Sequence, residues 1–281
     1  MSAEPLPKPG LDMGSGEITP AEFARLAKFL YEKSGINLQS GKENLVKSRL
    51  SKKLREHSLA NYDEYLDMVE RDKTGAMLSS MMDALSTNKT SFFREPEHFT
   101  FFEQVLLANN PNSLKVWSAG CSSGEEPYTL SMILNEKLGK TRASGAKILA
   151  TDLSTRVLAK ASSGEYLEHE MEGIPPAMRT KYFSRVSGER SYFYRANQDL
   201  KQIISFARLN LMGDWPMKGP FDAIFCRNVM IYFDKPTKEK LVQRYFSLLR
   251  SGGYLFIGHS ESLSGLGTEF KYVQPALYEK P

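Results

Sequence analysis

The 281-residue sequence predicts an α/β protein in which an all-α N-terminal domain precedes a domain built on a mainly parallel sheet. Three observations predict this class. Helical periodicity without strand signals fills the chain from residue 17 to 87. A short apolar strand, a glycine turn and a helix follow between Val116 and Leu138. Strands then alternate with helices up to a C-terminal hairpin.

Residues 1–16 hold three prolines and three glycines with little apolar content, so we expect a disordered lead-in. The helical domain, expected at 17–87, begins at Thr19-Pro20-Ala21-Glu22, which reads as a capping box with proline at the first helical position. The first helix is expected to end at Gly35, and Asn61 to cap a third helix. Methionines at helical spacing in the fourth, such as Met81, are expected to fill the core.

The second helix, expected from Lys42 to His57, is rich in basic residues. Arg49, Lys52 and Lys53 share one face because they are three and four positions apart. A solvated helix surface is one interpretation of this face. The other is a docking surface for an acidic partner, since clustered charge steers association.

The segment at 88–112 joins the two domains and contains Asn88, Thr90 and Arg94 around the pair Phe92 and Phe93. A simple linker would not need two aromatic residues, so we expect this segment to pack. It is either a wedge between domains, with Arg94 reaching solvent, or a wall of an active site.

The domain expected at 113–281 opens with the strand that ends near Trp117 and the turn that carries Gly120 and Gly124. Small residues there let a ligand approach the backbone, and a helix N-terminus offers free amides. Glu125 and Glu126 stand where a dinucleotide would place its pyrophosphate, and two carboxylates repel phosphate but suit hydroxyls and a cationic ligand. The turn therefore favours a nucleoside without phosphates, such as S-adenosylmethionine; a purely structural turn is the alternative.

The second strand is expected at 147–151 and ends at Asp152, which can accept hydrogen bonds from both hydroxyls of a ribose. Its alternative role is helix capping beside Ser154. Residues 166–201 lose regularity and are too long for an ordinary connection, so we expect a small inserted β-subdomain. Further strands are expected at 203–207, 221–226 and 254–257, before a terminal hairpin.

Several classes of function are disfavoured. The net charge of +4 does not argue for nucleic acid, and no apolar run is long enough to span a bilayer. Without a signal sequence, the chain is expected in the cytoplasm, with Cys121 and Cys226 as reduced thiols. Gly258-His259-Ser260-Glu261-Ser262 lacks the closing glycine of a hydrolase elbow. The four histidines show no metal-ligand spacing, so no metal is expected.

Three motifs together resemble the CheR family, the S-adenosylmethionine-dependent methyltransferases that esterify glutamates on bacterial chemoreceptors. They are Asn88-x-Thr-x-Phe-Phe-Arg94, Ser122-Ser-Gly-Glu-Glu-Pro-Tyr128 and Phe225-Cys-Arg-Asn-Val-Met-Ile-Tyr-Phe233, in the family's order. The resemblance runs from about Ile18 to the C-terminus. It implies the Rossmann-like class I methyltransferase fold, with a seven-stranded sheet, a reversed last hairpin and an inserted β-subdomain, behind the all-α domain.

The resemblance also implies roles for single residues. Arg94 and Tyr232 would stand beside the transferred methyl group. Cofactor contacts would come from nine positions: Asn88, Thr90, Arg94, Glu126, Asp152, Asn210, Leu211, Arg227 and Asn228. Of the two adjacent glutamates, the second is the one expected to face the cofactor, because neighbouring helix residues point about 100° apart.

The implied reaction converts glutamates of methyl-accepting chemotaxis proteins into methyl esters and leaves S-adenosylhomocysteine. A glutamate, with a reference pKa near 4.3, is ionised at neutral pH, so no general base, metal or catalytic histidine is expected. The receptor's glutamate-rich helical bundle would suit the basic face with Arg49, Lys52 and Lys53. In some family members the β-subdomain binds a receptor C-terminal peptide by strand addition, so that peptide is a further possible partner.

Overall fold

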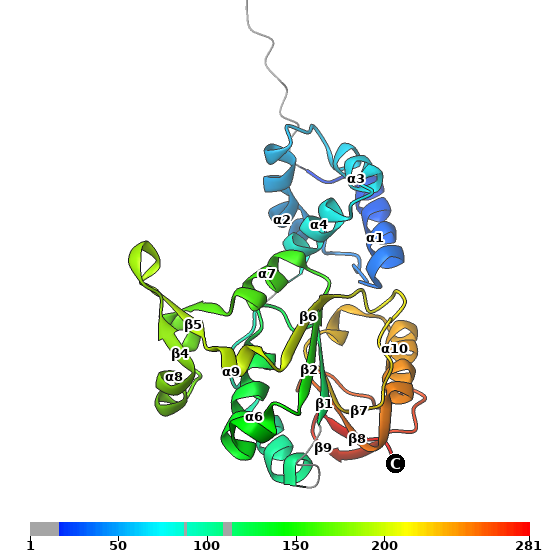
Figure 1. Ribbon diagram of the computed structural model, residues 1–281. Helices are drawn as coiled ribbons and strands as arrows, with labels where there is room; N and C mark the ends of the chain where they lie inside the picture. The colour runs from blue at the N-terminus through cyan, green and yellow to red at the C-terminus, as the bar shows by residue number, and fades with distance from the viewer. Residues whose placement is uncertain (1–16, 87–88, 109–113) are drawn as a thin grey trace, which may run out of the picture. The chain divides into compact units, whose positions relative to one another are not determined.

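The computed structural model describes residues 17–86, 89–108 and 114–281, which form two units (Figure 1). The helical unit contains the described chain up to Tyr31 together with Leu38–Ser86. The sheet unit contains Glu32–Asn37 and the described chain from residue 89 onward. The expected lead-in at 1–16 and Asn88 lie outside the described residues.

The helical unit is built from α1 (Pro20–Ser34), α2 (Glu43–Glu56), α3 (Tyr62–Arg71) and α4 (Ala76–Leu85); the last turn of α1 belongs to the sheet unit. The expected capping box at the start of α1 is present, because Thr19 and Glu22 exchange backbone-to-side-chain hydrogen bonds. The side chain of Asn61 caps α3, as expected. The core is apolar and includes a methionine, with Leu26, Leu30, Val46, Leu50, Tyr65 and Met81 fully buried.

The sheet unit contains a seven-stranded sheet in the order β6-β2-β1-β7-β8-β10-β9. The first five of these strands run parallel, and β10 is antiparallel to both of its neighbours. This confirms the class I methyltransferase sheet with a reversed last hairpin. The strands are β1 (Lys115–Ala119), β2 (Lys147–Asp152), β6 (Ile204–Arg208), β7 (Phe221–Cys226), β8 (Leu249–Ile257), β9 (Lys271–Gln274) and β10 (Leu277–Glu279).

Helices cover both faces of this sheet (Figure 1). One face packs against α6 (Glu125–Ala143), α7 (Thr155–Ser163), α9 (Gln198–Lys201) and the α5 (Pro96–Phe101) and η1 (Phe102–Leu107) pair, and the other against α10 (Lys235–Leu248). Alternate residues of the strands serve the two cores: Phe225 faces the first, whereas Trp117 and Cys226 face the second. The carboxyl ends of β1, β2 and β7 consequently lie between the helices that pack on the two faces of the sheet.

Three local details of the helices and strands bear on the site. The helix that leads toward β1 begins at Pro96 and continues as a π-helix over η1. The helix after the glycine turn begins at Glu125, before Pro127, so both glutamates lie in its first turn. Gly252 and Gly253 lie inside β8, because α10 already ends at Leu248.

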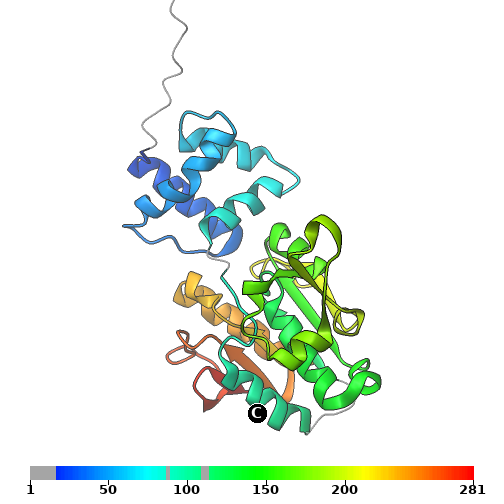
Figure 2. The ribbon, with the colours of Figure 1, turned by 90° about the vertical axis from the view of Figure 1, so that its left-hand side faces the viewer.

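The expected inserted β-subdomain is present as a three-stranded antiparallel sheet (Figure 2). Its strands β3 (Glu165–Leu167), β4 (Phe183–Arg185) and β5 (Phe193–Ala196) pair in the order β3-β5-β4. They are joined by η2 (Glu168–Met171), α8 (Pro176–Tyr182) and η3 (Gly188–Arg190). The aromatic ring of Phe92 packs against Tyr166 and Phe183 of this subdomain, so the segment after residue 88 does pack, as expected.

Candidate active site

The glycine turn after β1 is shaped by its backbone. Gly120 has φ +89°, and its amide and that of Cys121 both donate to the Thr151 carbonyl of β2, at 2.8 and 2.9 Å. A Cβ at Gly120 would lie 2.4 Å from Cγ2 of Val229, beyond the tip of β7. Glycine is therefore required, because the turn both adopts a left-handed conformation and touches the next loop.

Asp152 lies at the end of β2 and fixes the same turn. Its Oδ2 accepts from the Ser122 amide at 2.8 Å and its Oδ1 from the Ser154 amide at 2.9 Å. Ser154 in turn caps α7 with its side chain. The Ser154 contact agrees with the helix-capping role considered for Asp152, and the Ser122 contact places its carboxylate beside the glycine turn.

The two glutamates at the start of α6 have different surroundings. Glu125 is buried, its carboxylate accepts from the Ser123 hydroxyl at 2.8 Å, and burial raises its pKa. Glu126 has one oxygen 2.7 Å from the Ser118 hydroxyl and the other 3.0 Å from Nη1 of Arg227. Glu126 therefore faces the strand tips, and Glu125 faces the protein interior.

Arg227, which follows β7, joins three segments of the site. Its buried guanidinium binds Glu126 and also Oε2 of Glu95 at 3.0 Å, donates to the Arg94 carbonyl and lies over the Phe99 ring. Burial alone would raise the pKa of Glu95, but Arg227 and His259 together outweigh burial, and that pKa lies below its usual range. The network holds two carboxylates for one guanidinium, so it carries a net negative charge.

The segment before α5 holds strained backbone. Phe93 and Glu95 have φ of 54° and 57°, which is uncommon outside glycine. The Phe93 amide donates to Oγ1 of Thr129 on α6 at 3.2 Å, which ties the segment to the glutamate-bearing helix. Arg94 is partly exposed, and its Nη1 donates to the Lys89 carbonyl at 3.0 Å.

Thr90 is partly buried on the same segment. Of the expected cofactor contacts, only Asn88 lies outside the described residues.

The loop after β7 is held by a residue whose role the sequence does not reveal. The carboxylate of Glu261 accepts from the amides of Asn228 at 2.9 Å, Ile231 at 3.0 Å and Gly258 at 2.5 Å. Burial raises the pKa of Glu261 even though these amides favour its charged form. Asn228 has φ 59°, and the loop leads into η4 (Met230–Tyr232), so Glu261 fixes the backbone that presents Tyr232.

Asn210 and Leu211 follow β6 and lie close to the end of α1. The Asn210 amide group donates to the Lys33 carbonyl at 2.6 Å, and its oxygen accepts from the Met212 amide at 3.0 Å. Leu211 is almost fully buried. Since the Asn210 side chain is used within the chain, a contact with a cofactor there would come from the backbone or from Leu211.

The expected docking residues lie on α2 of the helical unit, and they differ in how far their charged groups are already engaged within the chain. Nη1 of Arg49 donates to the Leu85 and Ser86 carbonyls at 3.0 and 2.8 Å, so Arg49 binds the C-terminal end of α4. Lys53 pairs with Glu56 at 2.9 Å, whereas the side chain of Lys52 is 78% exposed. Lys52 is thus the most available of the three charges.

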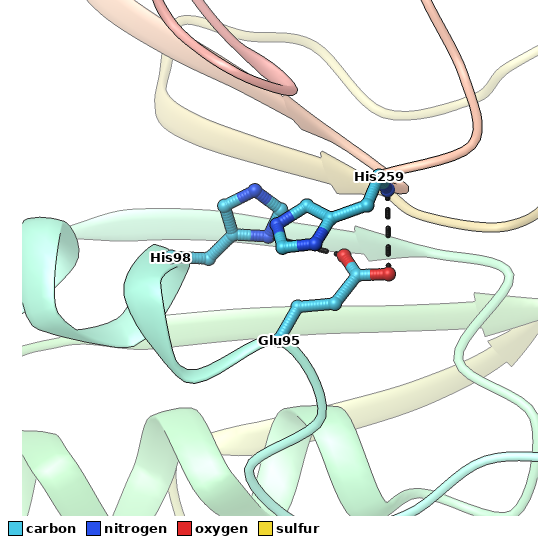
Figure 3. Close-up of side chains that lie close together, drawn as sticks. All are labelled: Glu95, His98 and His259. Atoms are coloured by element: carbon cyan, nitrogen blue, oxygen red, sulfur yellow. Dashed lines mark hydrogen bonds and ion pairs between the residues drawn. The ribbon is translucent and has the colours of Figure 1, made fainter.

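The structure also bears on the chemistry that the sequence disfavours. Burial raises the pKa of the Cys226 thiol, which makes a nucleophilic role implausible. In Gly258-His259-Ser260-Glu261, the carboxylate of the glutamate accepts hydrogen bonds from backbone amides of the loop after β7. The histidines are far apart in sequence, but folding brings His98 and His259 together beside Glu95 (Figure 3).

The carboxyl ends of β1, β2 and β7 thus present a glycine turn, the carboxylate of Asp152 and an acidic network. A phosphate would be repelled, whereas a nucleoside with a cationic group fits the charge.

Residues 88–278 match the family described as CheR methyltransferase, SAM binding domain, and residues 21–86 match the CheR methyltransferase all-alpha domain. The chain belongs to the CheR family. It is an S-adenosylmethionine-dependent methyltransferase, which confirms the resemblance seen in the sequence.

Chemotaxis protein methyltransferases from several bacteria are similar over nearly the whole chain. The Borreliella burgdorferi protein is 40% identical over 94% of this chain and 95% of its own length. The Escherichia coli protein is 39% identical over 90% of this chain and 88% of its own length. Within the described ranges, no helix combines the length and apolar character that crossing a bilayer requires.

Proposed function

We propose that this CheR-family chain methylates glutamate side chains on the cytoplasmic part of chemotaxis receptors, with S-adenosylhomocysteine as the second product. The relatives are named as chemotaxis protein methyltransferases, which supports a receptor substrate. The observation that carries the proposal is the acidic network of Glu95, Glu126 and Arg227 at the helix start. Its excess negative charge suits a cationic cofactor. A cytoplasmic location is part of the same proposal, because that is where the substrate side chains lie.

The proposed cofactor contacts follow the strand tips. Glu126 supplies negative charge near the cationic end, Asp152 accepts from the ribose hydroxyls, and Leu211 borders the adenine region. Arg227 keeps Glu126 and the Arg94 segment together, so its contribution to the methionyl end is mainly to orient other groups. Asn228 and Thr90 complete the wall on either side. When bound, S-adenosylmethionine supplies an electrophilic methyl group on a sulfonium sulfur.

The protein's own task in the reaction follows from charge. A carboxylate meets a sulfonium cation and neutral products form, so charge disappears along the path and bulk water opposes the step. The chain therefore has to exclude water and align the carboxylate. Arg94, partly exposed beside the strained backbone, is suited to hold the carboxylate by charge-assisted hydrogen bonds. Tyr232 shapes the opposite wall.

Substrate docking would use two surfaces outside the strand tips. Lys52 and Lys53 offer positive charge on α2 for a glutamate-rich helical bundle, while Arg49 is largely engaged with α4. β3 and β4 are the edge strands of the β-subdomain, and Ser184 and Arg185 of β4 are exposed. Strand addition at β4 would suit a receptor C-terminal peptide.

The decisive experiment is transfer of tritiated methyl from S-adenosylmethionine to receptor-containing membranes, followed by treatment with base. We expect protein-bound label that base releases as methanol, since glutamate methyl esters hydrolyse readily. Base-stable label, or label on RNA or small molecules, would refute the substrate.

Arg94→Ala tests the catalytic assignment in the same assay. We expect turnover to fall at least about 100-fold, because a charged group that orients the nucleophile is lost. Cofactor affinity, measured separately by calorimetry, distinguishes loss of catalysis from loss of binding. Normal turnover would remove Arg94 from the mechanism.

A further inference from the structure

Three side chains lie close together at one edge of the site, and the proposed methyl transfer gives this group of three no role. Glu95 and His98 are three positions apart at the start of α5, and His259 follows β8. Each offers one ligand atom, and these atoms lie within 4.8 Å of one another. Figure 3 shows the two rings meeting edge to face next to the carboxylate, with ring centroids 5.1 Å apart.

His98 is the unusual member of this cluster. Its side chain is fully buried, and neither ring nitrogen has a partner among the described residues at normal hydrogen-bond distance and angle. The Pro275 backbone approaches the ring, and Nδ1 lies 3.5 Å from Oε2 of Glu95. Buried polar groups without a partner are rare in folded proteins. A neutral imidazole keeps one nitrogen lone pair that can bind a metal ion.

Glu95 and His259 complete a donor set that suits a particular class of ion. Oε1 of Glu95 accepts only a weak contact from the His259 amide at 3.3 Å, and the His259 side chain is exposed and free to turn. Two imidazoles and a carboxylate are ligands typical of Zn²⁺ and related transition-metal ions. We propose that Glu95, His98 and His259 bind one such ion, with a fourth position open to solvent.

Binding an ion requires the three ligand atoms to move closer together. Ligands about 2.1 Å from a tetrahedral ion lie about 3.4 Å from one another, so a present spacing of up to 4.8 Å has to shrink by up to about 1.4 Å. His259 can supply this movement from the exposed side, while His98 stays fixed in the core. The nearby guanidinium of Arg227 opposes a cation, but Glu95 and Glu126 together outweigh its single charge.

Metal binding at this position has a consequence for the site. The ion competes with Arg227 for the carboxylate of Glu95, and Arg227 is the residue that holds the Arg94 segment against Glu126. The metal would therefore act as a reversible inhibitor of methyl transfer and not as a participant in it. Inhibition rests on the proposed function, whereas binding does not, so the two are measured separately.

Binding is tested with Co²⁺ added to tag-free, metal-free protein at neutral pH, because Co²⁺ in a low-symmetry nitrogen and oxygen site absorbs visible light. We expect a band that saturates at one equivalent and is bleached by Zn²⁺. His259→Ala should lose this band. His169→Ala, which removes another exposed histidine of the sheet unit, should keep it. No saturable band, a band that survives in His259→Ala, or a band lost from His169→Ala would overturn the site.

Inhibition is tested in the tritium-transfer assay with Zn²⁺ and a chelator. Without metal, His259→Ala should turn over like the unmodified protein. With Zn²⁺, only the protein that retains His259 should lose activity, and the chelator should restore it. Equal inhibition of both proteins would overturn the regulatory role even if the Co²⁺ band is present. If neither protein transfers methyl groups, the proposed function fails while the binding result stands on its own.

Discussion

Replacing Arg227 by methionine would remove the guanidinium that joins Glu95 to Glu126 while keeping a side chain of similar length. The Arg227 side chain is 3% exposed, and those of both carboxylates are 13% exposed. The variant therefore leaves two largely buried negative charges facing each other without a counter-ion. We expect a loss of unfolding free energy and of cofactor affinity together.

The size of the loss follows from burial. Removing one partner of a buried ion pair costs about 3–5 kcal/mol. A typical domain is stable by about 5–15 kcal/mol, so the variant remains folded but visibly weakened. Adding Glu95→Gln removes one unpaired charge, so the double variant should recover at least about 1 kcal/mol relative to additivity.

Urea unfolding followed by tryptophan fluorescence is the assay. The two tryptophans, Trp117 and Trp215, both lie in the sheet unit, so the signal reports the unit that contains Arg227. Arg179→Met is the matched control, because Arg179 forms an ion pair with Glu168 on the surface of the sheet unit, where the two side chains are 37% and 66% exposed. Its loss should cost at most about 1 kcal/mol.

An Arg227→Met variant as stable as the control would refute the reasoning, since buried carboxylates cannot lose their counter-ion without a penalty. Strict additivity with Glu95→Gln would show that the two residues are not energetically coupled.

Glu125→Gln should become more stable relative to the unmodified protein as pH rises above the usual pKa of a glutamate, about 4.3, in urea titrations. Burial raises the pKa of Glu125 in the folded protein, so the unfolded chain ionises first and the unmodified protein loses stability as pH rises. Gly120→Ala should cost about 2 kcal/mol and weaken cofactor binding in calorimetry, since its Cβ meets Val229 at a φ that strains alanine. Lys52→Glu with Lys53→Glu should slow receptor methylation most at low salt, without changing cofactor affinity.

Each of these outcomes has a control and a result that contradicts it. Constant relative stability of Glu125→Gln across the pH range would mean that Glu125 is not buried as described. Gly265→Ala has a similar φ of 72° but open space around it, so equal losses at both glycines would discount the contact with Val229. Charge reversal at the exposed residues Lys235 and Lys240 of α10 should have less effect on receptor methylation; an equal effect would show general repulsion.

The fold could be predicted from sequence because its signals are local. The capping residues Thr19 and Asn61, the glycines of the first turn and the alternation of apolar residues each act within a few positions along the chain. The choice of Glu126 over Glu125 is likewise consistent with adjacent helix positions pointing in different directions, and the structure gives them different neighbours.

The supporting contacts could not be predicted, because they depend on residues distant in sequence. Glu95 looks like an ordinary acidic residue at a helix start until Arg227 is placed beside it. Glu261 stands in a motif that invites comparison with hydrolases, yet its partners are amides of another loop. Arg49 shares a face with two lysines, but its guanidinium is committed to the end of α4.

A crystal structure with S-adenosylhomocysteine tests the central claim most directly, namely that an acidic turn after β1 binds the methyl donor. We expect the nucleoside at the turn beyond Trp117, with its ribose hydroxyls on Asp152 and its amino group near Glu126. Density for the nucleoside at any other place on the chain would contradict the account.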